Sequence, residues 1–375
     1  MGKNMRYLGL DVHAATIAVA IAEGRGEVRS LGQIPNRPEA VLKLLKKLGD
    51  VRTLHACYEA GPTGYVLYWQ LTKLGVQCEV IAPSLVPQKT GDRVKTDRRD
   101  AEKLARALRA GDLTSVFVPD AEHEALRDLV RAREAAKTDQ LRARHRLSKY
   151  LLRYGKSPPA GCRAWTLTWW RWLRTLKFEH ALQTTTVLDY TNELEHQSAR
   201  VERLEKSIDD AIESAPPHMK AVIDALQSLR GVAKITAVTL AVEVGTFRRF
   251  DRATQLMSYT GMVPSERSSG ARERRGAITK AGNSRLRRVL IEAAHHYRHQ
   301  PRLSTRQRAL QRDLTPAVAE TAWKAQLRLH RRYQLLTGKT KPAGKVITAI
   351  ARELVGFIWA IGCAAENQSQ LRVAA

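Results

Sequence analysis

The stretch Tyr7-Leu-Gly-Leu-Asp-Val-His13 is a short apolar run that carries a carboxylate near its end. Such a run predicts a buried β-strand. Further strand-like runs follow at residues 16–22, 27–34, 53–58 and 77–82. Helical spacing of apolar residues marks residues 38–48, 64–74 and 97–110. Three strands in succession, followed by strand–helix alternation, predict an α/β domain over residues 1–120 with a mixed sheet flanked by helices.

Four carboxylates of this domain fall at the ends of predicted elements. Asp11 ends the first strand, Glu59 closes the fourth, and Asp97 and Asp100 share one face of a helix start. Hard oxygen ligands of this kind bind Mg²⁺, and such ions stabilise the charges of phosphoryl transfer. Taken singly, each carboxylate is more often a turn or capping residue. The set of four, with Asp11 inside an apolar strand, favours a metal centre. His13 is expected either near this centre or in a structural role.

The charge of the chain is strongly basic and unevenly distributed. The 375 residues include 63 Lys and Arg against 37 Asp and Glu, a net charge of +26. Residues 215–375 hold 28 basic and 10 acidic residues, so most of the excess lies there. This field attracts a polyanion, and no basic amphipathic helix dominates, so nucleic acid is favoured over an acidic membrane surface.

The cysteines and apolar segments indicate a soluble intracellular protein. No pair of the four cysteines is spaced as CxxC, which excludes a zinc ribbon or a disulfide framework and fits a reducing cytosol. No signal-peptide region precedes the first strand. The longest apolar stretch, residues 346–365, is interrupted by Arg352 and Glu353 and predicts a buried helix. We therefore expect a cytoplasmic protein with no membrane partner.

Residues 121–214 predict a helical spacer. The segment 121–152 has no strand signal, and apolar residues between 194 and 212 follow coiled-coil-like steps. Two long helices are expected, paired with each other or with a partner chain, and dimerisation is favoured. Between them lie four tryptophans, which either close the helical pair as core aromatics or stack on unpaired bases. They are Trp165, Trp169, Trp170 and Trp172.

The C-terminal part contains two further motifs. Residues 226–240 predict a helix, a tight glycine turn and a second helix, similar to a helix–hairpin–helix that holds a DNA phosphate. Lys234 is a candidate contact there, but Ala233 stands where the motif usually has a second glycine, so a purely structural turn is an equal alternative.

Residues 256–288 predict a Gly- and Ser-rich loop ringed by basic residues and followed by a basic helix. Glycines permit close approach to a phosphate backbone, and guanidinium groups pair with its oxygens. A serine hydroxyl in such a loop is a candidate nucleophile, although loop serines are more often turn residues. The candidate phosphate or RNA contacts, which alternatively form a solvated basic face, are Arg272, Arg274, Arg275, Lys280, Arg285, Arg287 and Arg288.

Two sets of motifs resemble one family. The segments Gly9-Leu-Asp-Val-His13, Tyr58-Glu-Ala-Gly61 and residues 92–101 resemble the Asp–Glu–Asp–Asp signature of RuvC-like, ribonuclease-H-type domains. The residues around the last pair, Asp97 and Asp100, resemble one group in particular, the DEDD transposases of bacterial insertion sequences that use a bridge RNA. Residues 261–287 resemble the C-terminal transposase domain of the same group, whose catalytic serine precedes a glycine. That serine corresponds to Ser269, with Ser268 as the alternative.

The resemblance implies a complete organisation and mechanism. Residues 1–120 would form the RuvC-like DEDD metal-binding domain, 121–214 a coiled-coil linker, and 215–375 a mainly α transposase domain. A bridge RNA would pair with donor and target DNA, and Ser269 would form a phosphoserine bond while Asp11, Glu59, Asp97 and Asp100 hold Mg²⁺. In this group the two domains of one active site come from different protomers, which implies a homodimer, and a tetramer at synapsis, in the bacterial cytosol.

Two alternatives remain open from the residues alone. A RuvC-like, metal-dependent nuclease on branched DNA would need the four acids but not Ser269. A non-catalytic, basic nucleic-acid-binding scaffold would need neither.

Overall fold

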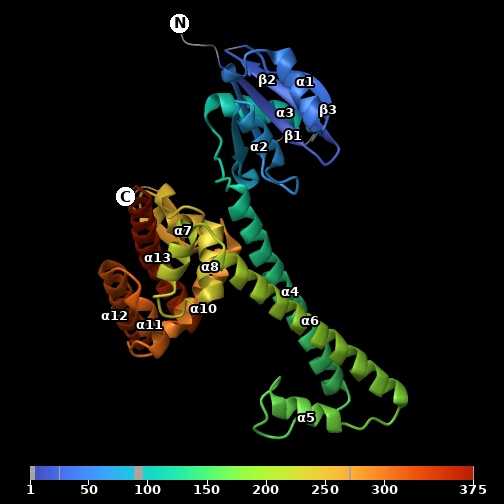
Figure 1. Cartoon of the computed structure of the whole chain (residues 1–375), viewed down its shortest axis with the longest axis vertical. Coiled ribbons are helices and arrows are strands. Elements are labelled where there is room, and N and C mark those ends of the chain that lie inside the picture. Colours follow the sequence, from blue (N-terminus) through green and yellow to red (C-terminus); the bar gives the residue numbers. More distant parts are fainter. Residues whose placement is uncertain (1–4, 25, 88–95, 270–271, 375) are drawn as a thin grey trace. The chain divides into compact units, whose positions relative to one another are not determined.

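The chain forms two compact units, Met1–Pro119 and Asp120–Ala375, in a computed structural model (Figure 1). The structure describes residues 5–24, 26–87, 96–269 and 272–374. Each unit is described by itself below. The three-part division predicted from the sequence stays a prediction.

Unit 1 is a five-stranded mixed sheet with helices on both faces. Its elements are β1 (Arg6–Val12), β2 (Thr16–Glu23), β3 (Arg29–Pro35), α1 (Pro38–Leu48), β4 (Leu54–Glu59), α2 (Val66–Lys73), β5 (Gln77–Ile81) and α3 (Asp97–Ala110). The strand order is β3-β2-β1-β4-β5. The first three strands run antiparallel, and β4 and β5 run parallel to β1. This confirms the predicted mixed α/β sheet domain.

Alternate residues of the strands face different helices. Leu8 and Leu10 of β1 join a core cluster with apolar residues of α1 and α2. On the opposite face, small residues of β2 pack against Ala101 and Ala105 of α3, because a strand exposes successive side chains to opposite faces. This face of the sheet is therefore covered by α3, which carries two of the candidate acids.

Unit 2 begins with a long pair of helices. The elements are α4 (Ala121–Arg153), α5 (Leu167–Thr175) and α6 (Ala181–Glu213). Arg133 pairs with Glu205, Gln140 donates to Ser198, and Tyr150 near the end of α4 donates to the carbonyl of Gln183 near the start of α6. The helices therefore run antiparallel within one chain, as Figure 1 shows. Whether the pair also forms a coiled coil with a partner chain stays a prediction.

The tryptophans lie at the end of this pair. Trp169 is buried in a small cluster with Leu147 and Leu194, and the other three tryptophans are partly buried against it. Arg144 lies over the ring of Trp165 at 5.4 Å. This packing matches the core-aromatic interpretation of the segment.

The rest of unit 2 is helical apart from one hairpin. Its elements are α7 (Pro217–Leu226), α8 (Lys234–Val244), α9 (Ala253–Tyr259), β6 (Pro264–Ser269), β7 (Arg272–Ile278), α10 (Ser284–Ala294), α11 (Thr305–Arg312), α12 (Pro316–Gly338) and α13 (Ala343–Ala374). α13 is the centre of the core and packs against α7, α9, α10 and α12. Of the described helices it alone is long and apolar enough to cross a membrane, and half of its most apolar stretch is buried inside the fold. The predicted buried helix over residues 346–365 is thus confirmed.

Two local predictions in unit 2 need correction. The helix expected to begin at Leu226 ends there, and the turn that follows is mostly buried. A Cβ at Gly231, whose φ is +80°, would lie 2.5 Å from the Ala293 carbonyl, so the turn packs against α10. The loop expected over residues 264–278 is instead the β6–β7 hairpin, because its polar side chains alternate across two exposed strands.

Candidate active site

The sheet register places two of the predicted acids side by side. Leu10 of β1 lies opposite Tyr58 of the parallel strand β4, so Asp11 and Glu59 are neighbours at the carboxyl ends of the two strands. Gly9 of β1 lies against the backbone of α3, and the Cys57 thiol of β4 donates to a carbonyl of α3. By alternation, Asp11 and Glu59 project from the same face of the sheet, the one that α3 covers.

The first turn of α3 brings the other two acids to this edge. The Thr96 side chain caps the helix by accepting from the Arg99 amide, so Asp97 is not the cap. Asp97 and Asp100 both lie in this first turn. A Cβ on Gly9 would lie 2.1 Å from the Ala101 carbonyl oxygen, so only glycine lets α3 approach the strand this closely.

His13 joins two of the acids. Its Nε2 lies 3.3 Å from Oδ2 of Asp11 and 3.6 Å from Oδ1 of Asp97. Gln33 donates to the other oxygen of Asp97 at 3.4 Å. Burial raises the pKa of Asp11 above its ordinary value, His13 opposes the rise, and the charges of Asp100 and Asp97 add to it. The carboxylates are therefore close enough to repel one another.

This edge fits a divalent cation. The candidate ligand atoms of Asp11, His13 and Asp97 all lie within 4.8 Å of one another. Asp100 acts on Asp11 through its charge, and Glu59 is placed beside Asp11 by the register. A concentration of carboxylate oxygens at one sheet edge is the donor set that Mg²⁺ prefers, with water filling the remaining positions. A bound cation would also neutralise the repulsion between these acids.

The β6–β7 hairpin separates the two candidate serines onto opposite faces. Ser268 donates to the Glu266 carboxylate at 2.8 Å, and Arg275 lies 3.7 Å from the same carboxylate. In the strand register Arg267 lies directly opposite Arg274, so both side chains project from one face of the hairpin. Side chains alternate along a strand, which places Ser269 on this same face. The face of Ser269 is thus basic, whereas Ser268 shares its face with the Glu266–Arg275 pair.

The base of the hairpin is fixed by close backbone contacts. The Thr279 amide donates to the Val263 carbonyl at 2.9 Å, and the Lys280 amide donates to the Gly261 carbonyl at 3.0 Å. A Cβ on Gly261, whose φ is +65°, would lie 2.1 Å from the Ala281 carbonyl oxygen. The hairpin therefore projects from a tightly packed base.

A buried ion pair holds this base to the helical core. Glu243 of α8, with a side chain 1% exposed, accepts two bonds from Arg131 of α4 at 2.7 and 2.9 Å. Asn283 caps α10 with its oxygen and donates to Glu243 at 2.7 Å. Burial acts to raise the pKa of Glu243, but these hydrogen bonds outweigh it, so the pKa lies below its ordinary 4.5. This network was not predicted from the sequence, although the carboxylate of Glu243 inside the apolar run of α8 is a signal of the same kind as Asp11.

The predicted phosphate contacts divide into two groups. Arg285 and Arg288 of α10 pair with Glu134 of α4, Arg287 donates to the Thr260 carbonyl at 2.8 Å, and Lys234 pairs with Asp209 at 2.7 Å. These four are engaged within the fold. Arg274, Arg275 and Lys280 are exposed on or beside the hairpin. The backbone of Arg272 pairs with Ser269 at the hairpin end, and its side chain lies outside the described part. Arg267 is an exposed hairpin arginine that the sequence analysis did not select.

The mixed sheet with its acid edge, together with a helical C-terminal region, is consistent with a RuvC-like DEDD transposase. Residues 8–156 match the family model of the IS110-type DEDD transposases. Residues 223–308 match the model described as the transposase IS116/IS110/IS902 family.

Full-length relatives agree with these matches. A putative transposase of Sinorhizobium fredii, y4qE, is 45% identical over 360 residues, which cover 95% of this chain and 88% of the relative. The transposase for insertion sequence element IS1533 of Leptospira borgpetersenii is 35% identical over 348 residues, which cover 90% and 99%. The chain belongs to the IS110 family of insertion-sequence transposases, and it is a DNA recombination enzyme.

Proposed function

We propose that this transposase cuts and rejoins donor and target DNA through a phosphoserine bond at Ser269, guided by a bridge RNA and aided by Mg²⁺. The observation that carries the choice of nucleophile is the division of the hairpin into two faces. Ser269 lies with Arg267 and Arg274, which attract a phosphate, whereas the hydroxyl of Ser268 is bonded to Glu266, which also pairs with Arg275.

The covalent step conserves phosphodiester bonds. The Oγ of Ser269 attacks a backbone phosphorus and releases its proton, an Oγ–P bond forms, and a P–O bond to one deoxyribose breaks. The leaving oxygen takes up a proton as a hydroxyl. A hydroxyl of the exchanged strand then attacks the phosphoserine, the Oγ–P bond breaks, and Ser269 regains a proton. Each broken phosphodiester is replaced by a new one, so strand exchange needs no external energy source.

The residues of the two units have separate tasks. Arg267 and Arg274 would hold the phosphate beside Ser269 and offset its charge. Asp11, Glu59, Asp97 and Asp100 would hold Mg²⁺, with His13 at the same edge. When bound, the ion lowers the charge of a phosphate and stabilises the leaving oxygen.

The proposed partners follow from the charge and from the family. A net charge of +26 suits a protein that holds several nucleic-acid strands. Three of the relatives are named as transposases for insertion sequence elements. We include in the proposal a structured bridge RNA that pairs with both DNAs, a homodimer that becomes a tetramer at synapsis, and action in the cytoplasm.

A denaturing gel tests the mechanism. The protein is incubated with Mg²⁺, the RNA encoded by its own element, and labelled donor and target DNA. The expected result is a protease-sensitive protein–DNA adduct that forms in the wild type and in Ser268→Ala but disappears in Ser269→Ala. An adduct that persists in Ser269→Ala and disappears in Ser268→Ala would reverse the assignment of the nucleophile.

The metal-dependent nuclease is the second candidate, and one observation favours it. The acid edge is built entirely from unit 1 and needs no serine. A nuclease would yield cut DNA with no adduct, equally in the wild type and in Ser269→Ala. A non-catalytic scaffold would yield neither product, and the double variant Asp11→Asn, Asp100→Asn would then retain every activity.

A further inference from the structure

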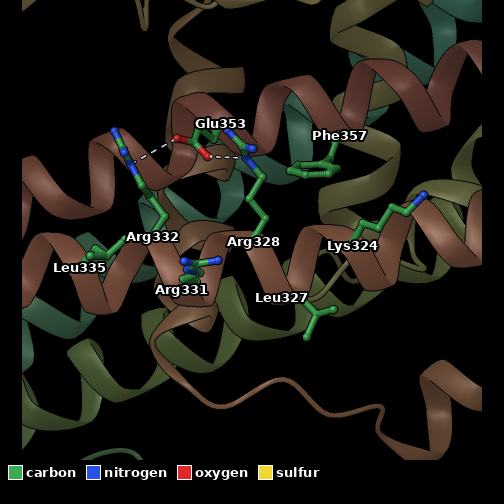
Figure 2. Close-up of a pocket in the computed structure, with 8 residues that line it drawn as sticks. All are labelled: Lys324, Leu327, Arg328, Arg331, Arg332, Leu335, Glu353 and Phe357. Atoms are coloured by element: carbon green, nitrogen blue, oxygen red, sulfur yellow. Dashed lines mark hydrogen bonds and ion pairs between the residues drawn. The ribbon is translucent and has the colours of Figure 1, made fainter.

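A groove between α12 and α13 carries charge and apolar surface that the proposed chemistry does not use. It has a volume of about 790 Å³ and lies outside the parts of the chain that match the two family models. Figure 2 shows arginines of one helix grouped around a single glutamate of the other, with an aromatic ring beside them.

The basic side chains of the groove come from one face of α12. Lys324, Arg328, Arg331 and Arg332 are spaced by four, three and one residues, which places them along one stripe of the helix. Glu353 of α13 is the one acidic residue lining the groove, so its walls carry a net charge of +3.

The carboxylate of Glu353 contacts two guanidinium groups, each on its Nε side. It lies 3.1 Å from Nε of Arg328 and 3.3 Å from Nε of Arg332. Both contacts use Nε, and the side chains remain 69% and 44% exposed, so the terminal amino groups stay available to a ligand. Planar, pre-positioned guanidinium groups of this kind match phosphate oxygens.

The groove also offers apolar contact. Phe357 lies one turn beyond Glu353 on α13 and is partly buried against the core. Leu327 and Leu335 on the rim are 47% and 52% exposed. A ligand that satisfies this surface carries phosphates and flat apolar groups together, and such a ligand is an unpaired nucleic-acid strand.

We propose that the α12–α13 groove binds an unpaired stretch of nucleic acid, with phosphates on Arg328, Arg331 and Arg332 and a base against Phe357. The axes of two packed helices lie about 8–10 Å apart, so the hollow along their contact is narrow and suits one strand, whereas a duplex would touch only its rim. The inference rests on the proposed function, in which RNA and DNA strands are held, and adds where one of them lies.

Fluorescence anisotropy of the full chain tests this with three labelled probes: an oligouridylate and an oligothymidylate of about 12 nucleotides, and a DNA duplex. The main variant is the triple change Arg328→Ala, Arg331→Ala, Arg332→Ala. The matched control removes three exposed positive charges of α1, as Lys43→Ala, Lys46→Ala, Lys47→Ala. Thermal melting verifies that each variant is folded.

The groove variant is expected to bind the single strands at least about tenfold more weakly, with a salt dependence whose slope falls by about 2, because each phosphate contact on a single strand contributes about 0.7. The control is expected to keep both values, and duplex binding should change little. Relative affinity for the two single-stranded probes tells whether RNA or DNA is the preferred occupant.

Two milder variants keep the test decisive if the triple variant unfolds. Phe357→Leu keeps the apolar volume but removes the ring, and it should weaken single-strand binding about fivefold with an unchanged salt slope. Arg331→Ala alone should lower the slope by about 0.7.

Several results would overturn the inference. Equal losses of single-strand affinity in the groove and control variants would show that overall charge, and not the groove, causes the effect. Unchanged single-strand binding with a lost dimer would assign the groove to a second copy of the chain. A wild-type protein that binds no probe would count against both this inference and the proposed function, whereas wild-type binding that the groove variant retains would count against the groove alone.

Discussion

The acid edge of unit 1 and the hairpin of unit 2 are two parts of the proposed chemistry, and they are built in opposite ways. The acids lie at the ends of buried strands and in the first turn of a helix packed on them, so the core of the sheet fixes their positions. The hairpin projects its serines and arginines from two exposed strands, and backbone hydrogen bonds fix it at its base. The candidate metal ligands of unit 1 are thus fixed by a packed core, whereas the candidate nucleophile of unit 2 is exposed to solvent.

The largest effect should come from neutralising an acid at the fixed site. Asp11→Asn removes a carboxylate ligand, and a metal ion contributes several kcal/mol to phosphoryl transfer, so strand exchange should fall about a thousandfold. The measurement is the rate of recombinant product formation at saturating Mg²⁺. Glu39→Gln, an exposed carboxylate of α1, is the matched control and should be unaffected. Equal rates in the two variants would show that the acid edge is not catalytic.

The next effect tests how the sheet supports the acids. Gly9→Ala places a Cβ 2.1 Å from the Ala101 carbonyl, so α3 must shift, and we expect about 1–3 kcal/mol of destabilisation. The same shift moves Asp97 and Asp100, so activity should fall more than stability alone explains. Denaturant melts and recombination assays on the same preparation measure the two losses. Gly61→Ala is the control, because its Cβ would meet nothing closer than 3.9 Å. A fully active Gly9→Ala protein would argue against a positioned α3.

The smallest effect concerns the base of the hairpin. Glu243→Gln leaves Arg131 without its buried partner and should destabilise unit 2 by about 2 kcal/mol. Adduct formation at Ser269 should fall with it, because Asn283 loses a charged acceptor. Glu292→Gln, on an exposed pair of α10, should change stability by less than about 0.5 kcal/mol.

The pH dependence of stability gives a second readout of this pair. The folded pKa of Glu243 lies below its ordinary 4.5, so the carboxylate stabilises the fold above pH 4.5. That contribution is lost as the pH falls from 4.5 through the lower folded value. Glu243→Gln should lack this part of the acid destabilisation. Parallel acid melts of the two proteins that lose stability equally in this window would contradict the assignment.

The proximity of the acids could be predicted from the sequence because its signals are local. Strand ends, the spacing of Asp97 and Asp100, and a charge inside an apolar run can each be read within a few residues. For His13 the sequence left two alternatives, a place near the acids and a structural role. The contacts of His13 with both Asp11 and Asp97 depend on the tertiary structure and could not be predicted from local sequence.

The hairpin could not be predicted by the same rules. Its strands are polar and rich in arginine, and their side chains are mostly exposed where the structure describes them, so they lack the alternation of apolar residues that marks a strand. The engagement of Arg285 and Arg288 by Glu134 joins residues about 150 positions apart, which composition cannot reveal. The basic helix α10 was therefore predicted correctly as a helix, while its arginines serve the fold in ways that only the structure shows.

The α4–α6 pair has a consequence for how the protein unfolds locally. Each helix has 33 residues and is about 50 Å long. One end of the pair belongs to the core around α13, and the other belongs to the separate tryptophan cluster. Hydrogen bonds and ion pairs connect the helices between these ends. Two apolar clusters joined by a polar stretch form two cooperative units, so amide hydrogens of α5 should exchange with solvent without unfolding of the C-terminal core.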